Sequence, residues 1–114
     1  MKRVFASLIA AILLAASIPV QATSYDGYVR NWWVQENGDL TFYFLDQTNS
    51  NWVTGMCGSP LYVLQVGKTN YNQLQVSLLL AAKNSYKVLM EVTACSGTTN
   101  IIKMAKVCTW TGDC

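Results

Sequence analysis

The chain has no histidine, and only 14 of its 114 residues are charged. Without histidine, neither a Ser-His-Asp triad nor a Cys-His nucleophile pair can form. The seven glycines are dispersed and build no GxxxxGK or GxGxxG phosphate-binding pattern. Paired-carboxylate catalysis would have to use acidic residues whose spacing singles out no pair. They are Asp26, Glu36, Asp39, Asp46, Glu91 and Asp113. We therefore expect a protein that is not an enzyme and uses no cofactor.

Cysteine is also scarce, with four copies in the whole chain. No CxxC pair occurs, and without histidine a zinc site would need an irregular set of four cysteines, so we expect no bound metal. All four lie between residue 57 and the C-terminus, and an even number in an exported chain is typical of disulfides. Three connectivities are possible for two bridges. We favour Cys57 with Cys95, which closes a long loop, and Cys108 with Cys114, which are close in sequence across a turn-like segment.

The N-terminus is typical of a secretory signal peptide. Two basic residues precede an apolar run from Val4 to Ile18, which is shorter than the roughly 20 residues of a transmembrane helix. The segment ends in small residues that suit cleavage after Ala22. We predict a signal peptide over residues 1–22, hence an exported protein, periplasmic or secreted, without membrane insertion. A buried N-terminal helix or an uncleaved anchor is the alternative.

Residues 23–114 then form the mature part, which is long enough for one domain with a modest core. Two of the eight basic residues leave with the signal peptide, so six basic and six acidic residues remain. The remaining basic residues are scattered: Arg30, Lys68, Lys83, Lys87, Lys103 and Lys106. A neutral surface of this kind lacks the basic footprint of nucleic-acid binding, so we expect neither nucleic acid nor an anionic membrane as a partner.

Three strands are predicted in the first half of the mature part. Tyr28–Glu36 and Leu40–Leu45 are strand-like and flank Asn37-Gly38, which favours a hairpin with a two-residue primed turn. A polar loop follows, and Pro60 then opens a third strand over residues 61–66.

The period of the apolar residues then changes. Leucine and alanine recur at helical spacing over residues 71–83, with Asn70 as the cap and Gln73 at the capping-box position. Residues 87–93 alternate like a half-buried strand, and residues 101–107 give the last strand. The order is β-β-β-α-β-β, which predicts an OB-fold-like five-stranded barrel plugged by the helix. An open α+β sheet with one packed helix is the alternative.

Aromatic residues supply the candidate binding groups. Trp32 and Trp33 are adjacent and must point to opposite faces of a strand, so we expect one in the core and the other outside. The alternative is that both are covered within the monomer. Indole rings stack on the flat apolar faces of sugars, while Asn side chains supply hydrogen bonds. The candidate ligand-binding residues are Trp33, Trp52, Trp110, Asn49 and Asn51. Ordinary loop packing is the competing interpretation for Trp52 and Trp110.

The pattern from residue 52 to 107 supports a resemblance. Cys57, the strand Leu61–Leu64, the Leu- and Ala-rich helix 74–82 and the strand from Lys87 to Cys95 follow one another at a characteristic spacing. This layout resembles the B-subunit family of subtilase-cytotoxin-like bacterial toxins and related small secreted OB-fold proteins. The resemblance implies a ring of five subunits that binds cell-surface glycans. It carries over no binding residue, because residues 23–29 do not match the family's opening.

We therefore expect a secreted or periplasmic non-catalytic binding module, glycan-binding by resemblance and homo-oligomeric. The alternative is a protein-interaction protein, such as a periplasmic inhibitor or an immunity protein. It draws on the same features: aromatic residues, neutral charge, two disulfides and no catalytic set.

Overall fold

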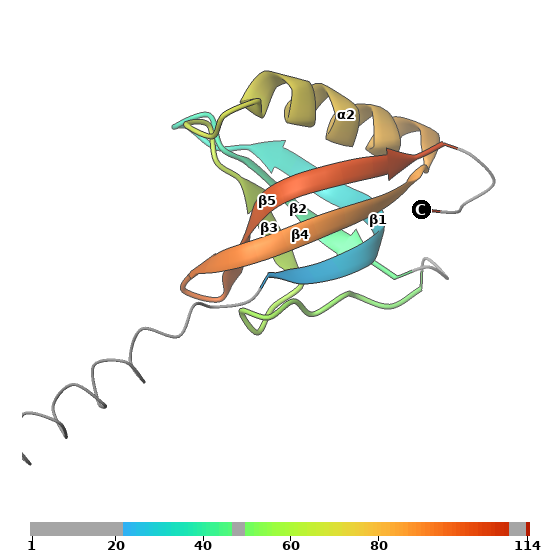
Figure 1. Cartoon of the computed structure of the whole chain (residues 1–114), viewed down its shortest axis with the longest axis horizontal. Coiled ribbons are helices and arrows are strands. Elements are labelled where there is room, and N and C mark those ends of the chain that lie inside the picture. Colours follow the sequence, from blue (N-terminus) through green and yellow to red (C-terminus); the bar gives the residue numbers. More distant parts are fainter. Residues whose placement is uncertain (1–21, 47–49, 110–113) are drawn as a thin grey trace, which may run out of the picture.

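The computed structural model describes residues 22–46, 50–109 and 114 (Figure 1). Its elements are β1 (Thr23–Val34), β2 (Leu40–Leu45), β3 (Leu61–Leu64), α2 (Tyr71–Asn84), β4 (Lys87–Ser96) and β5 (Thr99–Cys108). The predicted order of elements is confirmed, and each predicted element differs from the observed one only at its ends. Residues 1–21 of the predicted signal peptide lie outside the described residues.

The strands close into a barrel in the order β1-β2-β3-β5-β4, with β1 also pairing with β4. All pairs are antiparallel except β3 with β5, which run parallel at Tyr62↔Asn100 and Val63↔Ile101. A five-stranded closed sheet with its helix between the third and fourth strands is an OB-fold architecture, so the barrel is confirmed and the open sheet is wrong. Figure 1 shows α2 lying across one side of this barrel.

Strand β1 pairs with β4 and then with β2, and Gly27 is the last residue that pairs with β4. Residues 23–27 pair with β4, whereas Tyr28 and the residues after it pair with β2. The backbone of β2 approaches closely at this point, because a Cβ on Gly27 would collide with the carbonyl oxygen of Leu45. Only glycine leaves room for this approach.

The core fills the inside of the barrel and the inner face of α2. Its fully buried members alternate along the strands, as the pleat requires. They are Val29, Leu40, Phe42, Phe44, Tyr62, Leu64, Val88, Met90, Val92 and Ile102, joined by Leu78 and Ala81 from α2. The Tyr62 ring stacks on Phe42 with centroids 6.0 Å apart, and its hydroxyl donates to the carbonyl oxygen of Val53 at 2.9 Å. Burial raises the pKa of Tyr62, with a smaller contribution from Tyr25.

The β1–β2 turn differs from the predicted two-residue turn. The amide of Gly38 donates to Gln35 at 2.9 Å and the amide of Gln35 donates to Asp39 at 2.8 Å, so three residues form the loop. Gly38 alone among them has a positive φ, 99°. This is the pattern of a three-residue hairpin with glycine at its left-handed position. The primed-turn prediction is wrong because Asn37 keeps a negative φ and instead accepts the amide of Asp39 at 3.0 Å.

The start of α2 also differs from the prediction. Asn70 occupies the N-cap position in a left-handed conformation, with φ 66°, and its side chain makes no capping hydrogen bond. The capping box with Gln73 is therefore wrong, because a cap needs extended backbone that aims the side chain at the first turn. The side chain of Asn70 is left for other contacts.

Both predicted disulfides are confirmed, Cys57–Cys95 and Cys108–Cys114, and no cysteine is free. The first joins the loop before β3 to the end of β4. Such bonds are stable in the oxidising compartments that exported proteins reach. Within residues 22–46 and 50–109, no helix combines the length and the hydropathy that crossing a membrane requires.

A buried asparagine supports the same region as the first disulfide. Asn100 is fully buried, and its Nδ2 donates to Ser59 at 2.8 Å and to Leu61 at 2.9 Å. Its Oδ1 accepts the amide of Cys57 at 2.9 Å. All three partners are backbone groups, two in the loop before β3 and one at its first residue, so one side chain supplements the short parallel ladder between β3 and β5.

Candidate binding surface

A one-residue insertion in β1 exposes both adjacent tryptophans. Arg30 lies opposite Tyr43 but Trp33 lies opposite Thr41, so β1 has one residue more than β2 between these pairs. The insertion is at Asn31, whose φ is 50°. Trp32 is 48% exposed and Trp33 is 39% exposed. The prediction that one of the two is in the core is therefore wrong. Residues 31–34, which include the bulge and the end of β1, are all exposed and lie outside the packed barrel.

Three aromatic side chains form a continuous surface outside β1 and β2. Trp33 and Tyr43 have ring centroids 5.8 Å apart, and Tyr43 and Trp52 have centroids 5.1 Å apart. Trp33 and Tyr43 share the outer side because Trp33 lies opposite Thr41, two residues before Tyr43. We call Trp33, Tyr43 and Trp52 the aromatic face. Its two indoles are well exposed, 39% for Trp33 and 49% for Trp52.

The backbone fixes Trp52 against the barrel although it belongs to a loop. Trp52 forms an isolated bridge with Leu45, and the next amide, that of Val53, donates to Phe44 at 2.8 Å. The amide of Asp46 donates to the carbonyl of Asn51 at 2.8 Å, which closes the loop on the other side. The indole is thus held beside Tyr43 rather than free to move with the loop.

The predicted polar partners are only partly placed. Asn51 is exposed and next to Trp52, but its Nδ2 donates to the carboxylate of Asp46 at 3.4 Å, a long hydrogen bond. Asn49 and Trp110 lie outside the described residues. Of the five predicted binding residues, the structure brings together Trp33, Trp52 and Asn51.

Two residues of this surface were not among the predicted binding residues. Tyr43 links the two indoles, and Arg30 lies opposite it with its guanidinium 5.6 Å from the ring of Tyr28. The guanidinium also donates to the carbonyl of Val29 at 2.8 Å and to the hydroxyl of Ser85, just after α2, at 3.5 Å. The hairpin register could have identified Tyr43, because alternation places it outside β2.

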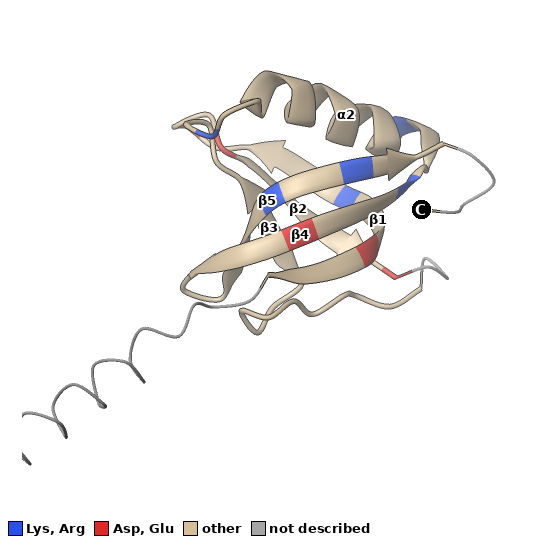
Figure 2. Ribbon diagram, in the orientation of Figure 1, with Lys and Arg blue, Asp and Glu red and all other residues tan. Residues whose placement is uncertain are grey.

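Most of the acidic residues that the sequence offered for catalysis lie apart. Asp26 and Glu91 are on neighbouring strands, since Asp26 lies opposite Leu89, but each is paired with its own lysine: Asp26 with Lys87 at 3.9 Å and Glu91 with Lys103 at 3.8 Å. Asp39 belongs to the hairpin, Asp46 to the loop before Trp52, and Asp113 lies outside the described residues. Figure 2 shows the charges of both signs spread over several elements. The described residues contain no group of three His, Cys, Asp or Glu side chains able to hold a metal ion.

No family model matches the chain, and no curated protein matches its sequence.

Proposed function

We propose that this protein is an exported, non-catalytic binding module that recognises glycans through the aromatic face. The observation that carries the proposal is the row of Trp33, Tyr43 and Trp52 with successive centroids 5.8 and 5.1 Å apart. Exposed indoles held by strand pairing offer flat apolar platforms at low entropic cost, and sugar rings present matching C–H faces. Arg30 lies opposite Tyr43 and Asn51 precedes Trp52, so the candidate donors to sugar hydroxyl groups are their N–H groups that are not engaged with Val29, Ser85 or Asp46.

A glycan array tests this proposal and compares three variants. The oxidised protein is applied to immobilised neutral and sialylated glycans. We expect Trp52→Ala to weaken binding by about fivefold or more, because stacking contributes about 1–3 kcal/mol per ring by analogy with base stacking. Trp33→Ala should weaken binding similarly. Trp32→Ala is the matched control, since Trp32 is as exposed as Trp52 but makes no ring contact with the aromatic face.

Two results would contradict the proposal: no glycan bound above background, or a Trp32→Ala loss as large as that of Trp52→Ala. Capture of one stoichiometric protein partner, without any glycan bound, would favour the inhibitor or immunity-protein alternative instead.

The proposal includes association of several copies, with five as the number that the toxin-family resemblance implies. Val76 and Leu80 lie one turn apart on α2 and are both exposed, a pattern that neighbouring subunits commonly cover. We expect light scattering coupled to size exclusion to give a mass near five subunits for the oxidised protein. A monomer over the accessible concentrations would rule out the ring and leave single-copy binding by the aromatic face.

A further inference from the structure

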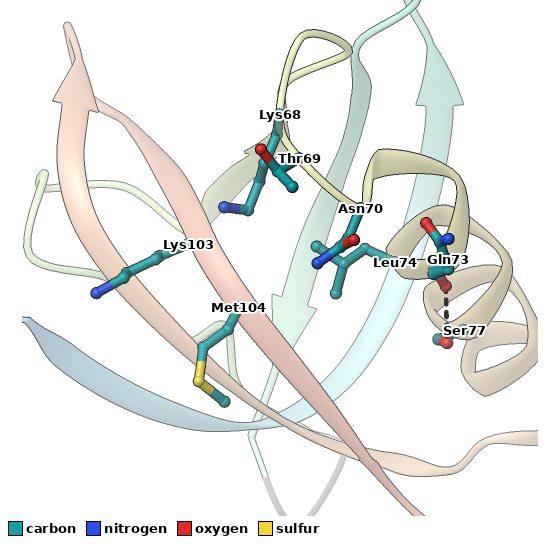
Figure 3. A pocket seen from close by; sticks show the side chains of 8 residues that line it. All are labelled: Lys68, Thr69, Asn70, Gln73, Leu74, Ser77, Lys103 and Met104. Carbon is teal, nitrogen blue, oxygen red and sulfur yellow. Dashed lines mark hydrogen bonds between the residues drawn. The ribbon is translucent and has the colours of Figure 1, made fainter.

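Two adjoining cavities lie between the β3–α2 connection and β5 and share no lining residue with the aromatic face. Their volumes are about 430 and 550 Å³, and both are lined by Lys68 and Lys103. The first, shown in Figure 3, extends to the start of α2, and the second extends to the β1–β2 turn at Asn37. We call the two cavities together the lysine groove. Each has the size of a small-molecule site, about 300–1,000 Å³.

A bulge in β5 places two consecutive residues in the lining of this groove. Glu91 lies opposite Met104 but Val92 lies opposite Ile102, so Lys103 is an extra residue in β5. Consecutive strand residues normally point to opposite faces, yet Lys103 and Met104 are both exposed and both line the first cavity. Bulges that re-aim side chains in this way are frequent beside functional sites.

A second bulge, in β4, lies beside the first. Val92 lies opposite Ile102 and Ala94 opposite Ile101, so Thr93 is the extra residue, and it lines the second cavity. The two insertions compensate, and the ladder regains its original register at Ala94. The ladder is therefore irregular only where it forms the floor of the lysine groove.

The charges in the groove favour an anion. No acidic residue lines the first cavity. Among the described residues, the ion pairs are Lys87–Asp26 and Lys103–Glu91, so Lys68 has no carboxylate partner there. The Lys103–Glu91 pair is 3.8 Å apart with the lysine largely exposed, a geometry that contributes little.

The one carboxylate that lines the second cavity is already engaged. The Oδ1 of Asp39 accepts the amide of Val66 at 2.8 Å, and its Oδ2 accepts the Nδ2 of Asn37 at 3.0 Å. These two bonds hold the hairpin end of the groove and partly offset the charge of the carboxylate. The ammonium groups of Lys68 and Lys103 are then the strongest charges available to a ligand.

We propose that the lysine groove binds a small organic anion, with Lys68 and Lys103 contacting its carboxylate or phosphate group. Lysine acts as a compact point charge suited to either group. In Figure 3 the Asn70 side chain, which does not cap α2, extends from the helix toward β5. We assign its amide to the polar body of the ligand. Leu74 and Met104 supply the apolar wall. This site is separate from the glycan proposal and stands without it.

Three matched probes test the site: glucose, glucuronate and glucose 6-phosphate, added to the isotope-labelled oxidised protein. We expect at least one of the two anions to shift the backbone amide NMR signals of residues 68–73 and 103–104, while glucose at the same concentration leaves them unchanged. A response to glucuronate alone assigns the carboxylate as the recognised group, and a response to glucose 6-phosphate alone assigns the phosphate. Raising the salt concentration should weaken the binding.

The variants Lys68→Gln and Lys103→Gln should each lower the affinity for the responding anion at least tenfold. Lys83→Gln, in the last turn of α2, is the control and should bind as the unmodified protein does. All three positions are on the surface, so the NMR spectrum will verify that each variant is folded. The site is ruled out if neither anion shifts the groove signals, if glucose shifts them equally, or if both groove variants bind normally.

Discussion

Replacing Gly27 with alanine should destabilise the protein by about 3 kcal/mol or more, because an added Cβ overlaps main-chain atoms rather than a movable side chain. The Cβ would collide with the carbonyl oxygen of Leu45 and come within 3.2 Å of the Phe44 ring. Relief requires β1 to move away from β2 at the residue where β1 changes its pairing to β4. The closure of the barrel therefore depends on this position. Urea unfolding followed by tryptophan fluorescence measures the loss.

Gly67→Ala is the matched control for Gly27→Ala. Nothing lies within 4 Å of a Cβ built on Gly67, and its φ is not positive. We expect a change of about 0.5 kcal/mol or less there, as for most surface substitutions. A Gly27→Ala protein as stable as the Gly67→Ala protein would show that β1 and β2 do not approach each other as described.

Removing the Cys57–Cys95 disulfide should have the second large effect. The bridge closes a separation of 38 residues, for which the loop-entropy model gives about 4 kcal/mol. The Cys108–Cys114 bridge closes a separation of 6 residues, for which the same model gives about 2 kcal/mol. We expect Cys57→Ser/Cys95→Ser to lower the free energy of unfolding more than Cys108→Ser/Cys114→Ser, measured by urea unfolding of both variants.

The buried hydrogen bonds of Asn100 explain why the loop should keep its place without the first disulfide. Its side chain still holds the backbone of Ser59 and Leu61, so the variant should fold, with the same far-ultraviolet circular dichroism, at lower stability. If the two disulfide variants lose equal free energy of unfolding, or if Cys108→Ser/Cys114→Ser loses more, the entropic explanation of the Cys57–Cys95 bridge is contradicted.

Much of this fold could be predicted from residue pattern because its signals are local. The alternation of Val88, Met90 and Val92 predicts a half-buried strand, and the helical spacing of leucines predicts α2. Their order restricts the topology to few solutions. The cysteine pairing could be predicted from the distances between the cysteines along the sequence and from the predicted export to an oxidising compartment.

The irregular features could not be predicted in the same way. Each bulge adds one residue to one strand, and the amino acids at these points, Asn31, Thr93 and Lys103, share no property that would mark a bulge. Their positions depend on the partner strand, which a single segment does not reveal. This is why the sequence placed one of Trp32 and Trp33 in the core and gave no sign of the lysine groove.

The candidate binding surface was predicted in part for the same reason. Exposed indoles in a polar loop and on a strand suggested Trp52 and Trp33 individually. Their connection through Tyr43 depends on the β1–β2 register and on the Leu45↔Trp52 bridge, both of which are long-range pairings. No residue pattern in the polar loop predicts the bridge with Leu45 that holds Trp52 in place.

The most direct test of the aromatic face is an NMR titration that follows the indole N–H signals of the labelled protein. The ligand is the strongest-binding oligosaccharide from the array. We expect the signals of Trp33 and Trp52 to shift together with a single dissociation constant, because both indoles contact Tyr43. The Trp32 signal should stay in place. A shift of Trp32 alone, or no shift in Trp33 and Trp52 at saturating ligand, would contradict binding by the aromatic face.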